Sequence, residues 1–255
     1  MNWKQGFIVV FCLTLSGCSY DYFIKDEFVV AKQRKLFQQL CQSPDRHFVK
    51  EVAEVEGYLS INAGRGCTLG WDPILRDGYS YSECVDKPIA AQSNPISSQV
   101  FYFTLEERGS PKCQAASEFF ISRWPGGGQG AINRKINYER EFKGLIDEKC
   151  LAVSYEDRVQ SKYAVSSESY YIYNEKKYPR QELRNILNKV ETFNRVKGII
   201  AESSHKVVDL SAMEIIAQRI NYTFYSKGTL HATHAIEKCD KNIPALDIPN
   251  ILKPR

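Results

Sequence analysis

Hydrophobic and polar residues alternate with a period of two along much of this chain, a pattern typical of β-strands with two different faces. In one clear example, Phe101, Phe103 and Leu105 fall on one face of an expected strand, and the residues between them fall on the other. This pattern predicts strands at residues 48–61, 79–84, 99–105, 150–155, 163–173, 195–210 and 214–225. The last two form a hairpin that turns through Ser211, Ala212 and Met213.

A period of 3.6 residues replaces the alternation near the start of the chain, which predicts a helix. Asp26 is a suitable N-cap, and Pro44 ends the helix after about Gln42. A second helix is expected at residues 112–123. Residues 179–190 fit either a helix or an extended segment, so this region stays open.

These elements predict an α+β fold: a single disulfide-stabilised domain with a mainly antiparallel sheet, an N-terminal helix and one or two further helices. One cluster of structure-breaking residues, Trp124–Gly130, predicts a loop. If the domain has two parts, this loop is the expected boundary.

The first 17 residues have the features of a secretory signal. Lys4 precedes the apolar stretch 7–15, and Leu15-Ser16-Gly17-Cys18 follows. Nine helical residues extend only about 14 Å, too short to cross a hydrocarbon layer of about 30 Å. The pattern resembles the lipobox of bacterial lipoproteins. This resemblance implies cleavage before Cys18, with diacylglycerol on its sulfur and an acyl chain on its new amino group.

The expected organisation is therefore a signal peptide at 1–17, a lipid-anchored linker at 18–25 and a periplasmic α+β domain at 26–255. No later apolar run approaches the roughly 20 residues of a spanning helix, so the lipid is the expected anchor. In the family that the lipobox resembles, aspartate after the acylated cysteine tends to retain a protein at the inner membrane. Ser19 stands at that position here, which favours the outer membrane, with the domain facing the periplasm.

The cysteine count agrees with export to a compartment that permits disulfides. Of eight cysteines, Cys12 leaves with the leader and Cys18 carries lipid, so an even number remains. The remaining residues are Cys41, Cys67, Cys84, Cys113, Cys150 and Cys239. No Cys-x-x-Cys occurs, which favours structural pairing over redox or zinc chemistry. Sequence alone cannot choose among the 15 connectivities of six cysteines. The preferred pairing is Cys67–Cys84, Cys113–Cys150 and Cys41–Cys239.

Charge argues against nucleic acid as a partner. The formal net charge of the 255 residues is only +4, the charges are evenly spread, and Lys4 leaves with the leader. The 43% hydrophobic composition is ordinary for a globular core.

Common catalytic motifs are missing, including His-Glu-x-x-His, Gly-x-Ser-x-Gly and a phosphate-binding loop. His231, His234 and Glu237 are spaced to share one side of a helical turn and could hold zinc. An exposed connection before Cys239 explains the same residues without a function. His47 and His205 lie in expected strands and are interpreted as sheet residues.

Tyrosine and tryptophan side chains offer stacking surfaces for a glycan or peptide, notably Trp71, Tyr79, Tyr81 and Trp124. Tyrosine is also a good strand former, and that structural interpretation is preferred.

Leu40-Cys41 with the segment 49–59, and the segment 206–210 leading to 214–217, are similar to uncharacterised proteobacterial lipoproteins. The resemblance implies a disulfide-bearing periplasmic domain and no activity.

Two hypotheses about the function remain. The preferred one is a non-catalytic, lipid-anchored envelope protein that binds a protein, peptide or glycan, for example to neutralise a toxin. It has no cofactor beyond the covalent lipid on Cys18. The alternative is a metal-dependent periplasmic hydrolase that uses His231, His234 and Glu237.

Overall fold

The computed structural model describes most of the chain beyond residue 27. The described residues are 28–62, 67, 70–86, 100–123, 133, 136–137, 139–179, 182–183, 198–225, 237–239 and 243–255. The expected leader, Cys18, His231, His234 and Trp124–Gly130 all lie outside them.

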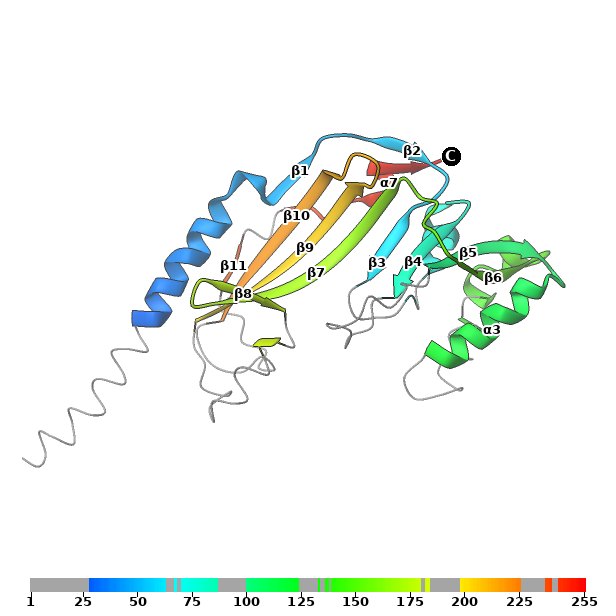
Figure 1. Ribbon diagram of the computed structural model, residues 1–255, viewed down its shortest axis with the longest axis horizontal. Coiled ribbons are helices and arrows are strands. Elements are labelled where there is room, and N and C mark those ends of the chain that lie inside the picture. The colour runs from blue at the N-terminus through cyan, green and yellow to red at the C-terminus, as the bar shows by residue number, and fades with distance from the viewer. Residues whose placement is uncertain are drawn as a thin grey trace, which may run out of the picture. The chain divides into compact units, whose positions relative to one another are not determined.

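The chain has the expected α+β fold, with a mostly antiparallel sheet, flanking helices and three disulfides (Figure 1). The main sheet contains ten of the described strands in the order β1-β10-β9-β7-β3-β4-β5-β6, with β11 beside β10 and β8 beside β7. A second sheet pairs β12 with β2. The strands are β1 (His47–Val49), β2 (Ala53–Val55), β3 (Leu59–Asn62), β4 (Ser82–Asp86), β5 (Val100–Glu107), β6 (Lys149–Glu156), β7 (Tyr163–Tyr173), β8 (Lys176–Pro179), β9 (Ile199–Asp209), β10 (Glu214–Tyr225), β11 (Glu237–Lys238) and β12 (Leu252–Pro254).

Two compact units can be distinguished within this single domain. Unit 1 comprises Met1–Arg46, Ser169–Ser203 and Ile220–Ile243, and unit 2 comprises His47–Glu168, Ser204–Arg219 and Pro244–Arg255. The division falls inside β7, β9 and β10, so each of these strands contributes residues to both units. The expected boundary at Trp124–Gly130 is therefore wrong, because no change in composition marks a boundary inside a continuous strand.

Unit 1 is built on the N-terminal helix, residues 28–42. Its apolar face buries Val30 and Phe37 with Ile200 and Phe224, and the rings of Phe37 and Phe224 lie 5.7 Å apart. Residues 28–42 are helical as predicted, while the expected cap Asp26 lies outside the described residues.

In unit 2, the expected strand at 48–61 is instead three short strands, β1, β2 and β3. Lys50 still follows the edge of β10, since its N–H donates to the Ile216 carbonyl at 2.7 Å. Beyond it the chain leaves this sheet, and β2 pairs in parallel with β12. Gly57 then allows a close approach to Tyr81 that a Cβ would prevent. These long-range partners explain why the hydrophobic pattern alone does not reveal the breaks.

Two helices cover an aromatic cluster in unit 2. α2 (Asp72–Asp77) was not predicted, although Pro73 in its first turn and Gly78 at its end, with φ 85°, are typical helix signals. α3 (Pro111–Arg123) confirms the second predicted helix and lies along β6 (Figure 1). Trp71, Phe103 and Phe119 pack edge to face beneath them, with Trp71 and Phe103 centroids 4.7 Å apart.

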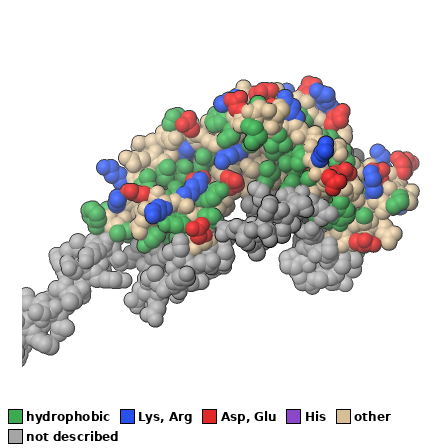
Figure 2. Space-filling view, in the orientation of Figure 1, with side chains coloured by type: hydrophobic (Ala, Val, Ile, Leu, Met, Phe, Trp, Pro, Cys, Tyr) green, Lys and Arg blue, Asp and Glu red, His purple; other side chains and the backbone are tan. Residues whose placement is uncertain are grey.

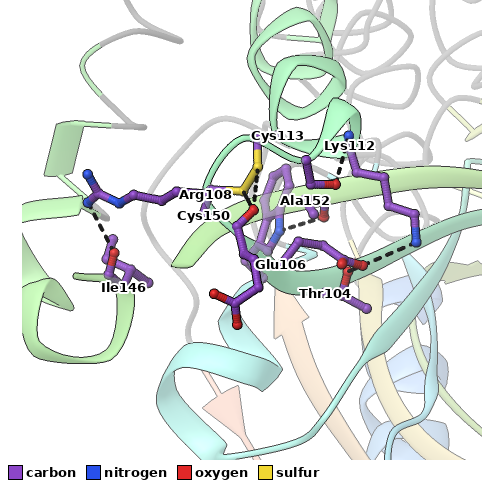
Figure 3. The surroundings of a disulfide bond; sticks show 11 residues. Thr104, Glu106, Arg108, Lys112, Cys113, Ile146, Cys150 and Ala152 are labelled. Atoms are coloured by element: carbon purple, nitrogen blue, oxygen red, sulfur yellow. Dashed lines mark hydrogen bonds and ion pairs between the residues drawn. A yellow bond between two sulfur atoms is a disulfide. The ribbon is translucent and has the colours of Figure 1, made fainter. Parts of the chain in front are cut away.

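The disulfides join Cys41 to Cys239, Cys67 to Cys84 and Cys113 to Cys150, which is the pairing preferred from the sequence. Figure 3 shows the third bond, which ties the start of α3 to β6. Beside it, the Arg108 guanidinium donates to the Ile146 carbonyl at 3.2 Å, and Lys112 contacts Glu106 at 3.1 Å (Figure 3). Cross-links between distant segments therefore supplement the core in both units.

Within the described part of the chain, none of the helices is both long enough and apolar enough to cross a membrane.

Candidate binding cavity

A polar cavity of about 470 Å³ lies in unit 2, where four segments distant in the sequence meet. These are the stretch from β2 toward β3, the residue before β4, the residues around the start of β7, and the residue after β12. The lining residues are Glu54, Val55, Glu56, Gly57, Tyr81, Gln160, Lys162, Tyr163 and Arg255.

Tyr81 is held in one wall by its neighbours. Its backbone N–H and that of Ser80 donate to the Glu56 carbonyl at 3.4 and 2.8 Å. Its ring stacks on Tyr102, with centroids 5.0 Å apart and planes 21° apart. A Cβ at Gly57 would lie 2.7 Å from two carbons of the same ring. Burial, together with the nearby Tyr81, raises the pKa of Tyr102 to about 12, so both phenols are neutral at physiological pH.

The loop that carries Gln160 is fixed by a buried carboxylate. Glu83 is fully buried, and its two oxygens accept the backbone N–H groups of Gln160 at 2.7 Å and Ser161 at 2.8 Å. Hydrogen bonds to an ionised acceptor are stronger than neutral ones. Glu83 therefore sets the position of one side of the cavity without lining it.

Lys162 is a positive residue on the same side of the cavity as Gln160, and the Asp209 carboxylate pairs with it. Its Nζ lies 3.2 Å from an Asp209 oxygen and 4.9 Å from the centre of the Tyr163 ring. Asp209 also accepts from the Ser211 hydroxyl and from the N–H groups of Ser211 and Ala212. The bond from the Ser211 hydroxyl is the largest of the causes that lower the pKa of Asp209 to about 2.

Arg255 reaches the cavity because β12 pairs with β2. Ala53 is the register partner of Leu252, and the Arg255 N–H donates to the Val55 carbonyl at 3.1 Å. The Tyr79 hydroxyl donates to the Leu252 carbonyl and fastens the strand. A parallel pairing of residues about 200 positions apart thus brings one more cation to the lining.

Three exposed charges at the cavity, those of Glu54, Glu56 and Arg255, have no ion-pair or hydrogen-bond partner for their side chains among the described residues. The lining therefore includes two acidic residues and one arginine whose side chains are exposed. Elsewhere, Figure 2 shows acidic and basic side chains interspersed over the described part of one face. Charge of both signs, with Gln160 as a neutral donor and acceptor, suits a polar ligand.

Of the three residues proposed for zinc, the structure describes one, Glu237. His231 and His234 lie outside the described residues, and the Glu237 carboxylate is 2.8 Å from Arg34, whose guanidinium also lies over Phe224. No group of three or more His, Cys, Asp or Glu side chains suited to a metal occurs among the described residues.

The histidines His47 and His205 occupy strands β1 and β9, as predicted. Burial, with Arg219 nearby, lowers the pKa of His205, which keeps it neutral at physiological pH.

Of the aromatic residues considered for stacking, Trp71 and Tyr79 are buried in the core and Trp124 lies outside the described residues. Of the three that the structure describes, Tyr81 lines the cavity. Sequence reasoning missed Glu54, Glu56 and Arg255, because an exposed charge becomes informative only when folding places it in a cavity without a partner.

Comparison with protein families, curated proteins and solved structures finds no match to this chain.

Proposed function

We propose that this chain is a lipid-anchored binding protein of the cell envelope, which holds a polar ligand in the cavity of unit 2. The observation that carries the proposal is the cavity of about 470 Å³ with three exposed, unpartnered charges among the described residues. Small-molecule sites typically have volumes of about 300–1,000 Å³.

Some other exposed charges of the chain are matched: the Lys50 Nζ lies 2.8 Å from a Glu214 oxygen, and an Arg76 nitrogen lies 3.0 Å from a Glu141 oxygen. Such pairs need no ligand. What supports recognition is that three exposed charges without a partner among the described residues gather around one hollow.

The anchor is supported by two features of different kinds. The segment Leu15–Cys18 resembles a lipobox, and the three disulfides fit an oxidising compartment. Nine residues lie between Cys18 and Phe28, the first described residue, so these two residues are at most about 35 Å apart. The anchored domain therefore stays near the bilayer, and by its Ser19 it belongs at the periplasmic face of the outer membrane.

The anchor is tested by replacing Cys18 with alanine. Cells are fed labelled palmitate and then fractionated. The wild-type protein is expected to carry label, to resist salt washing and to dissolve only in detergent, because several acyl chains hold it. Cys18→Ala is expected to carry no label, since alanine cannot form the thioether. Label on the variant, or none on the wild type, contradicts the anchor.

The ligand site is tested in cells with a photo-crosslinking amino acid. Gln160 lines the cavity, and Gln114 is a matched exposed glutamine on α3. A crosslinker at 160 is expected to capture a ligand that a crosslinker at 114 does not. Equal products from both positions, or none from 160, contradict a ligand in this cavity.

A further inference from the structure

We infer that the ligand of this cavity is a short peptide that carries both a positive and a negative group, rather than a glycan. This inference rests on the proposed function and specifies its ligand class. It comes from which lining groups are free to make contacts and which are already engaged.

The aromatic rings of the cavity are poorly placed to stack on a sugar. Tyr81 is stacked on Tyr102 at 5.0 Å and lies against Gly57, so its ring is already in contact on two sides. Tyr163 is buried, and Lys162 lies over its ring. Sugar recognition by stacking needs an open aromatic face, and the structure gives both lining tyrosines other contacts.

Three charged side chains of the lining have no hydrogen-bond or ion-pair partner among the described residues. Among the exposed side chains of the lining, Glu54 and Glu56 come from one wall and Arg255 from the end of β12. The Glu56 carboxylate lies near the phenol of Tyr81, since its charge contributes to the raised pKa of Tyr81.

The positive and the negative residues of the lining are expected to bind different groups of the ligand. Lys162 is paired with Asp209, so Arg255 is the cation of the lining without a protein carboxylate among the described residues. A guanidinium binds a carboxylate with two parallel hydrogen bonds, which favours a peptide carboxylate as its partner. Glu54 and Glu56 then receive an ammonium or guanidinium group. Gln160 can donate to or accept from the peptide backbone between them.

The inference is tested by affinity selection on the purified full chain. One pool contains tripeptides with free termini, a second contains the same tripeptides acetylated and amidated, and a third contains neutral oligosaccharides. Retained molecules are identified by mass spectrometry after equilibrium dialysis. Peptides that keep both charges are expected to be retained, and capped peptides without charged side chains are not.

Variants then assign the charges. Glu56→Gln and Arg255→Gln are each expected to weaken binding of the selected peptide at least tenfold, and Arg255→Lys to restore part of it. Glu51→Gln and Lys253→Gln are the controls, because both residues are exposed on the same segments but do not line the cavity. These controls are expected to bind like the wild type.

The outcomes separate this inference from the proposed function. Preferential retention of neutral oligosaccharides or capped peptides overturns the peptide assignment and leaves a ligand cavity. Equal affinity in wild type, Glu56→Gln and Arg255→Gln also overturns it. If no pool is retained, the inference is wrong, and if position 160 also gives no crosslink, the proposed function fails with it.

Discussion

The two faces of β4 and β5 differ in what their side chains contact. On one face, Phe101 and Phe103 join Trp71 and the Cys67–Cys84 disulfide in a core that excludes water. On the other, Glu83 fixes a loop and Tyr102 stacks on Tyr81 at the cavity wall. The buried contacts of the first face stabilise the fold. The second contains polar groups that are costly to bury or leave unmatched, and it is the face from which function is inferred.

The largest expected effect comes from the aromatic face. Phe103→Ala removes a fully buried ring that contacts Trp71 and Phe119, and is expected to lower the free energy of unfolding by about 3–5 kcal/mol. Tyr102→Ala on the opposite face is the matched comparison, with an expected loss below half of that, because Tyr102 is partly exposed. Urea denaturation of both variants measures the difference. Equal losses would mean that the two faces do not differ as described.

The buried disulfide of the same face is expected to contribute somewhat less. Replacing both Cys67 and Cys84 with alanine removes a cross-link between residues separated by 17 positions and is expected to cost about 3 kcal/mol. Single replacements are expected to cost similar amounts and to leave a free thiol. Denaturation under non-reducing conditions and thiol alkylation check both points, and a variant as stable as the wild type contradicts a structural bond.

On the other face, Glu83→Gln is expected to lower the free energy of unfolding by about 1–3 kcal/mol. The reason is that an amide replaces the carboxylate to which two backbone N–H groups donate. Hydrogen exchange at Gln160 and Ser161 is expected to accelerate. Glu156→Gln, a partly exposed residue of β6, is the control and is expected to leave these two amides unchanged. Unchanged exchange in Glu83→Gln would show that the loop is held by other contacts.

A smaller effect is expected from pH. The pKa of Asp209 falls from its ordinary value of 3.8 to about 2 in the folded chain, so its carboxylate stabilises the fold at neutral pH. This contribution is present above about pH 4 and is lost as the pH falls toward 2. Asp209→Asn is expected to be less stable than the wild type at pH 7 and to approach it at pH 2. Unfolding midpoints across this range check it, and a constant difference at all pH values contradicts the assignment.

Local patterns in the sequence predicted the regular elements well. Alternation identified β5 and β10, since each of these strands has one face more buried than the other, and the sequence also predicted β7 and β9. The preferred cysteine pairing also matches the structure. The strands could be predicted because alternation is a pattern of near neighbours in the chain. The disulfides could be predicted because six cysteines allow only 15 pairings.

The cavity could not be predicted in the same way. It depends on the pairing of β2 with β12 and on the close approach of Gly57 to Tyr81. It also depends on the hydrogen bond that Glu83 accepts from the backbone of a distant loop. Each of these contacts joins residues far apart in the sequence. Exposed charges such as those of Glu54 and Arg255 look like ordinary surface residues until that pairing is known.

The central claim is that the charged lining serves a ligand and not the fold. It is tested most directly by the free energy of unfolding of the triple variant Glu54→Gln, Glu56→Gln and Arg255→Gln, measured by urea denaturation without ligand. The account predicts a value within about 0.5 kcal/mol of the wild type, as for surface changes that remove no contact. A loss of the size expected for Glu83→Gln would contradict it, because the charges would then be structural.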